Sequence, residues 1–472
     1  MIFRKLMVYS CALAVIVSGG CASYPERVDS LKSQLSSDAK THKPEYNIYS
    51  DGGRNKLLAL MERGRLAQLR GEYRDSSQAY AEAISFSDAI EDKALVSVGD
   101  ALDSTLAVTY GNDLALDYPI VGFERMMLHV LDGFDRLALG DTDGFGVDMR
   151  NLERCRGMTK ARLNRDMEVL LKKRGLRRES SLKQSSSTVS YEEFMRSARL
   201  LTPGVKHSVD NAYAIYLMAL YRESRGDYRE ALALYKEIEG FNLLSDKNIA
   251  RGIELCSDNA IPDGYGDVIL FFEEGFIPPK RTNHVVFNDT WFYMLPNYAN
   301  ADCLPYEDGG PVVLMENGKY VDVAQRLCDL APLAILAHEE RMSGVVARKA
   351  LTAGLTSGMI HFNNVINGTI STNPLAEGVL LIGGFFTATT ASLMSAASER
   401  PDLRSWLLLP RQVQVLRCTM REGRHNITLC SAGKAENLVI EVSHGAKTII
   451  HCTSECGTLN CFAANISSVN NK

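Results

Sequence analysis

The chain has 472 residues, of which 46% are hydrophobic, and a formal net charge of −5. This length is enough for about two or three domains that each bury a core. The composition is that of a globular protein, and the lack of a basic excess argues against a nucleic-acid partner.

Residues 1–20 have the pattern of a secretory signal peptide. Arg4 and Lys5 precede an apolar run, and Gly19 and Gly20 come directly before Cys21. A basic start, a short apolar stretch and small residues at the cleavage point are typical of such signals. The apolar run is shorter than the roughly 20 residues needed to cross a bilayer.

Cys21 is the predicted lipid attachment site, because a cysteine directly after the small residues of a signal is typical of a bacterial lipoprotein. Ser18 stands where such signals usually have leucine, so an ordinary signal peptide or an uncleaved anchor is the alternative. Ala22 is not the aspartate that favours retention in the inner membrane, which indicates the outer membrane, facing the periplasm. The polar residues 21–52 would then form a lipidated tether.

Residues 53–260 are predicted to form a helical domain, in which small and aromatic residues recur twice at the same offsets. The first set is Gly64, Gly71, Tyr73, Ser76, Tyr80 and Ala83, and the second is Ala219, Gly226, Tyr228, Ala231, Tyr235 and Ile238. Small residues let two helices approach, glycine ends the first helix, and tyrosine fills the gap between them. The offsets resemble the tetratricopeptide repeat, a helix–turn–helix unit of about 34 residues. An ordinary pair of antiparallel helices is the alternative.

A third, weaker copy surrounds Gly140, which follows Gly71 by 69 residues, but Phe145 stands where a small residue is expected. Near residues 174–190 the chain becomes basic and serine-rich, which indicates a solvated loop within the helical domain. Stacked repeats of this type present a concave surface to partners, so the sequence predicts a docking groove along the helices.

Residues 261–452 are predicted to form a β-rich mixed domain. The apolar run 268–272 indicates a strand, and Asn317-Gly318 predicts a hairpin between residues 312–315 and 320–323. Helix is expected from Ala324 to about residue 355. Four further strands are predicted at 412–416, 426–430, 438–442 and 448–452, which together favour a sandwich or barrel-like arrangement interrupted by helices.

Residues 378–397 carry no charge and are predicted to form an apolar helix. Their length matches one bilayer crossing. Their many small residues favour a helix packed closely against other protein. An interfacial or membrane-inserting helix and an element of an oligomeric pore are the alternatives.

Cysteine usage indicates disulfides. Of the 11 cysteines, Cys11 lies in the signal and Cys21 would be acylated. The cell envelope is oxidising, and the spacings near the C-terminus are wider than those of a zinc knuckle. The connectivity stays open. Five cysteines lie in or just before the Cys/Ser/Asn-rich tail 453–472: Cys418, Cys430, Cys452, Cys456 and Cys461.

A search for reaction chemistry finds no complete motif. His338-Glu339-Glu340 lacks the second histidine of a zinc protease, because position 342 is Met342. The chain has no Gly-x-Ser-x-Gly elbow and no phosphate-binding loop. We therefore expect no catalytic residues, no cofactor and no metal.

Several short phrases stand in order along residues 112–425: Asn112-Asp113, Gly122-Phe123-Glu124-Arg125, Leu137-Ala138-Leu139-Gly140-Asp141, Glu274-Gly275-Phe276-Ile277-Pro278, Asp402-Leu403-Arg404-Ser405-Trp406, Leu409-Pro410 and Glu422-Gly423-Arg424-His425. Together these phrases resemble a family of uncharacterised bacterial lipoproteins with tetratricopeptide-like repeats. The chain departs from the family in its tail and at Phe145. The resemblance implies a non-enzymatic protein of the cell envelope, and it indicates only weakly a role in cell-wall assembly. Arg404 and Trp406 would close a loop before a strand or, as the second interpretation, bind a ligand.

The sequence therefore predicts an α+β protein, with an N-terminal tetratricopeptide-like helical array followed by a β-rich C-terminal domain with inserted helices. The expected function is that of a lipid-anchored scaffold that binds another envelope protein. One alternative is a membrane-active or oligomer-forming protein that uses residues 378–397. A third hypothesis is a peptidoglycan enzyme whose catalytic groups come from distant parts of the chain.

Overall fold

The computed structural model describes residues 24–38, 53–96, 117–176, 205–241, 247–258, 261–287, 291–298, 309–338, 340, 402–455 and 459–466. The predicted signal peptide, Cys21, residues 177–190 of the basic loop and the apolar helix 378–397 lie outside the described residues, as does Cys456. No described helix is both long enough and apolar enough to cross a membrane.

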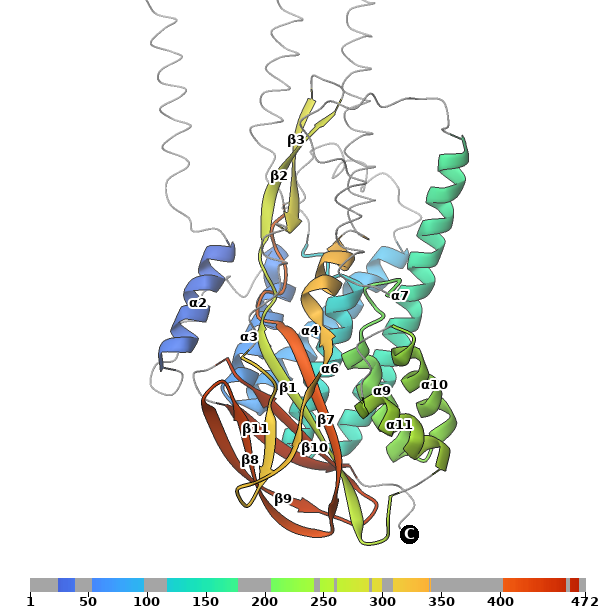
Figure 1. Ribbon diagram of the computed structural model, residues 1–472. Coiled ribbons are helices and arrows are strands. Elements are labelled where there is room, and N and C mark those ends of the chain that lie inside the picture. The colour runs from blue at the N-terminus through green and yellow to red at the C-terminus, as the bar shows by residue number, and fades with distance from the viewer. Residues whose placement is uncertain are drawn as a thin grey trace, which may run out of the picture.

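Both helices and sheets are present, so the chain is an α+β protein (Figure 1). The helices are α2 (Tyr24–Asp38), the short 3-10 helix η1 (Gly53–Asn55), α3 (Lys56–Leu69), α4 (Tyr73–Val96), α6 (Gly122–Ala138), α7 (Thr142–Leu176), α9 (Ala212–Ser224), α10 (Tyr228–Glu239) and α11 (Lys247–Asp258). A further helix begins at Leu330 and continues to His338. Helix α3 packs against α4, α6 against α7, and α9 against α10.

The strands form three sheets. They are β1 (Tyr265–Phe276), β2 (Lys280–Phe287), β3 (Trp291–Tyr298), β4 (Val313–Glu316), β5 (Lys319–Val323), β6 (Gln325–Asp329), β7 (Pro410–Arg421), β8 (Gly423–Ser431), β9 (Lys434–Val442), β10 (Lys447–Thr453) and β11 (Asn460–Ile466). The first sheet has the order β11-β10-β1-β7-β6, the second is the hairpin β2-β3, and the third has the order β5-β4-β8-β9. Among the described strands, all pairs are antiparallel except β1 with β10.

The five-stranded sheet lies between the helices and the four-stranded sheet. Alternate residues of a strand point to opposite faces. Ile269 and Phe271 of β1 belong to a core shared with the helices, whereas Leu270 and Phe272 belong to a core shared with the four-stranded sheet. The first core contains residues from both sides of the predicted domain boundary at residue 261. Burial of both faces explains why β1 is a continuous apolar run.

The strands predicted from alternation and turn residues are confirmed. The apolar run 268–272 lies within β1, and the four late segments lie within β7, β8, β9 and β10. The predicted hairpin is the β4–β5 pair, in which Asn317 and Gly318 have φ angles of 50° and 79°. Two consecutive positive φ angles are those of the tight turn that asparagine and glycine favour.

The helix expected from Ala324 is wrong over its first turn and a half, because residues 325–329 form strand β6. Its register with β7 shifts between Arg326 and Cys328. This bulge buries two consecutive residues, Leu327 and Cys328. The extra buried residue produces a spacing that resembles a helix, and the helix itself begins only at Leu330.

Two segments assigned to a tether and a tail are ordered parts of the fold. Residues 24–38 of the predicted tether form α2, whose Val28, Leu31 and Leu35 are buried in the first core. Their spacing of three and four residues places them on one side of the helix. Residues 460–466 of the predicted tail form β11, which pairs with β10.

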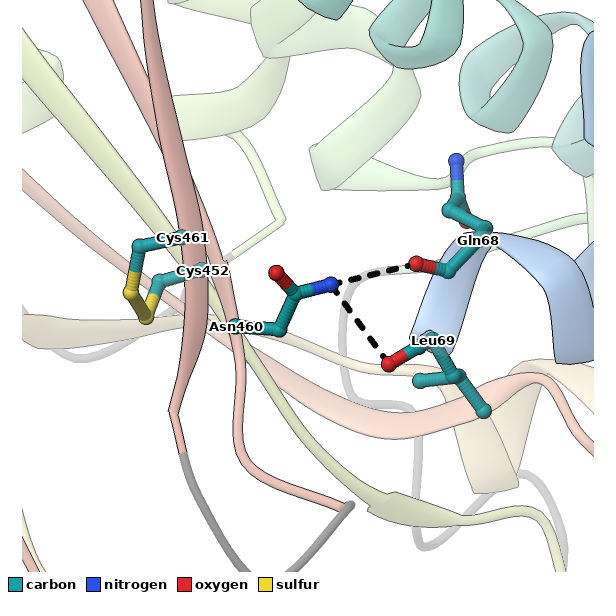
Figure 2. The surroundings of a disulfide bond; sticks show 5 residues. All are labelled: Gln68, Leu69, Cys452, Asn460 and Cys461. Atoms are coloured by element: carbon teal, nitrogen blue, oxygen red, sulfur yellow. Dashed lines mark hydrogen bonds between the residues drawn. A yellow bond between two sulfur atoms is a disulfide. The ribbon is translucent and has the colours of Figure 1, made fainter. Parts of the chain in front are cut away.

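A disulfide joins β10 to β11, as the cysteine pattern predicts. It connects Cys452 and Cys461, which are opposite each other in the register. Figure 2 shows that Asn460 extends from β11 to the end of α3, where Nδ2 donates to the carbonyl oxygens of Gln68 at 3.2 Å and Leu69 at 3.4 Å. These carbonyls are among the four at a helix C-terminus that have no partner within the helix. The disulfide and the helix cap therefore act on the same short strand.

Candidate interaction surface

The repeat residues of the first segment fix the contact between α3 and α4. A Cβ atom on Gly64 would lie 2.5 Å from the Tyr80 ring, so only glycine leaves room for this tyrosine. Ser76 Oγ donates to the Gly64 carbonyl at 2.8 Å, and Ala83 is buried beside them. Tyr73 is partly buried and meets the Phe462 ring of β11 edge-on at 5.2 Å. These side chains support the fold.

The second segment connects three helices. Ala219 and Ala231 are fully buried between α9 and α10. Tyr235 packs against α11, where a Cβ atom on Gly252 would lie 2.8 Å from its ring. Tyr228, at the start of α10, is partly buried. The turn glycine Gly226 has a φ of 81°, which residues with a side chain rarely adopt.

The third segment has the same spacing of small residues as the first two. Gly133 precedes Gly140 by the same seven residues that separate Gly64 from Gly71. A Cβ atom on Gly133 would lie 3.1 Å from Met149 and 3.3 Å from Phe145. Phe145 is fully buried. The expected small residue at position 145 would leave space between the two helices; here Gly133 leaves that space, and the Phe145 ring fills it. A search for small residues seven positions before the turn glycine would have found this pair.

The five-stranded sheet covers one face of the helices. Phe134 of α6 stacks on the His451 ring of β10 at 4.2 Å and meets Phe271 of β1 at 5.6 Å. Tyr213 and Tyr216 of α9 also contact Phe271, at 5.5 Å and 5.8 Å. This face is filled by the chain itself, so a partner that binds the helices has to use another one.

A buried cluster of charged side chains joins α9 to the sheet. Arg417 Nη2 donates to Asp267 at 2.5 Å and to Glu223 at 2.8 Å, and Lys447 Nζ donates to Glu223 at 2.6 Å. All four side chains are at most 6% exposed. Burial raises the pKa of Asp267, but the adjacent Arg417 and Lys447 outweigh it and hold that pKa below its ordinary value. The two acids and two bases neutralise one another, which makes their burial tolerable.

A second buried cluster joins α3 to the sheet. Arg65 Nη2 donates to Glu273 at 2.6 Å, and Tyr213 OH donates to the other oxygen of Glu273 at 2.8 Å. His451 Nε2 lies 3.3 Å from that oxygen. Burial alone would raise the pKa of Glu273, but Arg65 and His451 outweigh it and lower the pKa to about 2. Because these groups are fully buried and engage one another, both clusters hold the helices to the sheet.

Arg404 closes the loop that leads into β7. Its Nε and Nη2 atoms donate to the two oxygens of Asp402 at 2.7 Å and 3.0 Å, and Nη1 donates to Asn55 at 2.7 Å. The guanidinium group is 3% exposed and lies 5.7 Å from the Tyr118 ring centre. Arg404 therefore connects Asp402 of this loop to Asn55, which precedes α3.

Trp406 anchors the same loop against the helices. The side chain is 1% exposed and meets the Tyr80 ring edge-on at 6.0 Å, and its backbone N–H donates to Glu124 at 3.0 Å. A small pocket beside this loop is lined by Tyr118, Glu124, Lys280 and His338, among others. Tyr118 OH donates to both oxygens of Glu124 at 2.7 Å and 2.8 Å, so the Tyr118 hydroxyl and the Glu124 carboxylate already bind each other.

The four-stranded sheet has an outer face that no described element covers. Its inner face carries Leu314, Ile427, Leu429 and Ile440, which are buried in the second core. The register places two rows of residues across the outer face. One row is Tyr320, Met315, Thr428 and Asn437, and the other is Val323, Val313, Cys430 and Ala435.

Large apolar side chains are exposed on this outer face. Tyr320 is 64% exposed and Val439, which is opposite Asn426 in the register, is 53% exposed. The paired Arg424 and Glu441 lie at one end of the face. Val313, Met315 and Val323 are partly exposed on the same face, so apolar and aromatic residues lie beside charged and polar ones, as they do in protein-binding surfaces. Sequence reasoning missed this face, because alternation shows that a strand has two faces but not which of them lacks a cover.

Comparisons with family models, with curated proteins and with solved structures find no significant match. Within the described ranges, no group of three or more histidine, cysteine, aspartate or glutamate side chains could hold a metal ion. The interpretation of the outer face therefore rests on its own geometry.

Proposed function

We propose that this protein is a lipid-anchored scaffold of the cell envelope that binds another envelope protein through the outer face of its four-stranded sheet. The observation that carries the proposal is that the two most exposed large apolar side chains of the described residues, Tyr320 at 64% and Val439 at 53%, both lie on this face, on its edge strands β5 and β9. Together with the partly exposed Val313, Met315 and Val323 they make much of the face apolar, and apolar surface patches mark interaction sites. The anchor is Cys21, and the location is the outer membrane facing the periplasm.

The three helix pairs support a further part of this proposal, a degenerate tetratricopeptide-like array. In each turn the residue after the glycine donates its N–H to the carbonyl five residues earlier: Glu72 to Ala67, Asp141 to Arg136 and Asp227 to Arg222. The turn glycines have φ angles of 76°, 77° and 81°. Because the five-stranded sheet covers one face of the helices, we assign the helical array a structural role. We place the partner on the four-stranded sheet.

Crosslinking in intact cells, followed by purification and mass spectrometry, tests the proposal. We expect a reproducible envelope partner that is lost with Tyr320→Glu or Val439→Glu, because a carboxylate buried against an apolar partner surface has no compensating charge. Cys21→Ala is expected to abolish both the acylation and the crosslink. Val147→Glu and Met158→Glu are matched controls, since these α7 side chains are 46% and 44% exposed.

The controls also decide between the two surfaces. If the α7 variants remove the partner and the sheet variants retain it, the docking surface lies on the helices and our assignment is wrong. Unchanged acylation and membrane association of Cys21→Ala would refute the anchor.

A further inference from the structure

The hairpin β2–β3 projects from the body of the protein. Among the described strands, β2 and β3 pair only with each other. Their register places Lys280 opposite Tyr298 at the base and Phe287 opposite Trp291 at the far end. An isolated two-stranded hairpin is at best marginally stable in water, so a second surface is needed to support it.

The base of the hairpin is held firmly by the body. Ile277, which is 2% exposed, donates its N–H to the Leu409 carbonyl at 3.1 Å. Lys280 Nζ donates to the Arg404 carbonyl at 2.8 Å. The body therefore sets the direction in which the far half of the hairpin extends.

The composition of the hairpin changes along its length. The base includes Lys280, Arg281 and Asn297, whereas the far half has two apolar and aromatic runs, 285–287 (Val-Val-Phe) and 291–293 (Trp-Phe-Tyr), which the polar residues 288–290 (Asn-Asp-Thr) connect in the sequence. Tryptophan and tyrosine are enriched where a protein crosses the interface between water and a bilayer. The far half thus has the composition of a membrane-contacting segment.

Helix α2, which follows the predicted lipid anchor in the sequence, contacts the strand that leads into the hairpin. Helix α2 is docked by its buried residues, and Lys32 Nζ lies 5.0 Å from the centre of the Phe276 ring, just before the hairpin. In Figure 1, α2 lies beside the body below the hairpin, and the four-stranded sheet lies at the end opposite to the hairpin. Cys21 precedes Tyr24 by three residues, which span at most about 10 Å. A lipid on Cys21 would therefore hold the start of α2 close to the bilayer.

We propose that the far half of the β2–β3 hairpin lies in the membrane interface as a second contact beside the lipid anchor. This inference rests on the proposed anchoring at Cys21. Contact at two points orients the molecule, so that the outer face of the four-stranded sheet is presented away from the membrane.

Tryptophan fluorescence tests this contact, because the chain contains only two tryptophans, Trp291 and the buried Trp406. The lipidated full chain and its Trp291→Phe variant are incorporated into phosphatidylethanolamine–phosphatidylglycerol vesicles with plain or brominated acyl chains. Bromine quenches only tryptophans that reach the acyl region. We expect brominated lipid to reduce the emission of the wild-type chain and to leave that of Trp291→Phe unchanged.

Flotation of the vesicles, measured on the same samples, separates the two claims. A chain that floats with the vesicles but has equal emission in plain and brominated lipid would overturn the hairpin contact and leave the anchor intact. A chain that does not float contradicts the anchor and the hairpin contact together. Equal quenching of wild type and Trp291→Phe would show that the bromine reports on Trp406, and this too would overturn the contact.

Discussion

Replacing Arg417 by methionine is expected to destabilise the protein strongly, because it leaves two carboxylates buried beside one ammonium group. The guanidinium group donates to Asp267 through Nε at 3.1 Å and 3.0 Å and through Nη2 at 2.5 Å. It also reaches Glu223 at 2.8 Å and Tyr235 OH at 3.0 Å. After the substitution only Lys447 remains to neutralise Asp267 and Glu223.

The magnitude follows from the loss of one partner in a buried charge cluster. Such a loss typically costs about 3–5 kcal/mol of unfolding free energy. Removing the charge of Asp267 as well leaves the Glu223–Lys447 pair balanced. The double variant Arg417→Met with Asp267→Asn is therefore expected to be more stable than Arg417→Met alone, with a coupling energy of about 1–3 kcal/mol.

The substitution also changes the pH dependence. A depressed pKa contributes stability that is present above the unfolded value of about 3.9 and is lost as the pH falls through the folded value. In the wild type, Asp267 makes such a contribution, because Arg417 and Lys447 lower its pKa. Without Arg417 that pKa rises, so the deficit of the variant is expected to shrink in acid.

Urea unfolding followed by circular dichroism measures these differences. The matched control is Arg421→Met on the same strand, where the side chain is exposed and donates to Tyr265 OH at 3.2 Å. Its unfolding midpoint is expected to stay close to that of the wild type. An Arg417→Met deficit of under about 1 kcal/mol, or a double variant that is no more stable than the single one, would refute the reasoning.

Three further predictions concern the packing, the disulfide and one histidine. Gly64→Ala should cost about 1–3 kcal/mol in the same urea assay, because the new Cβ atom would lie 2.5 Å from Tyr80. Gly157→Ala, in an open part of α7, should instead raise stability by about 0.5–1 kcal/mol, and equal effects would contradict the packing argument. Cys452→Ser should cost about 2–3 kcal/mol, because the disulfide closes a short loop with a sequence separation of nine. A wild-type midpoint that is the same with and without reductant would show that the disulfide contributes nothing. His425 Nδ1 lies 2.5 Å from Glu316, and Nε2 lies 2.7 Å from the Arg421 carbonyl. Partial burial would lower the pKa of His425, but these two acceptors outweigh it and raise the pKa. The stabilisation is then present below about pH 6.5 and is lost as the pH rises through the folded value. Wild type should exceed His425→Gln in acid and approach it in base, and a pH-independent difference would contradict this.

Local signals in the sequence were sufficient to predict most strands and the helix turns. Asn317-Gly318 specified a hairpin because both residues tolerate positive φ. Gly71 and Gly226 likewise mark the ends of α3 and α9. The spacing of apolar residues predicted the wrong element at residues 325–329. The β-bulge there buries the consecutive residues Leu327 and Cys328, which produces a spacing that resembles that of a helix. Helix α2 was missed although its three buried residues recur at helical spacing, because a largely polar segment after a predicted lipid anchor is typical of a tether.

Contacts between distant parts of the chain could not be predicted from these local signals. Arg417 meets Glu223 across 194 residues, and Arg65 meets Glu273 across 208. A charged residue in a strand has the same local pattern whether it faces water or a buried partner. For the same reason, local patterns could predict a groove on the helices. They could not predict that β1 and β10 cover one face of those helices.

Site-specific photocrosslinking in intact cells tests the scaffold proposal most directly. A photoreactive amino acid is placed at Tyr320 or Val439 on the sheet and, as the comparison, at Val147 or Met158 on α7. The proposal predicts the same envelope partner at both sheet positions and none at the α7 positions. Crosslinks to that partner from α7 alone, or no protein crosslink from either sheet position, would contradict it.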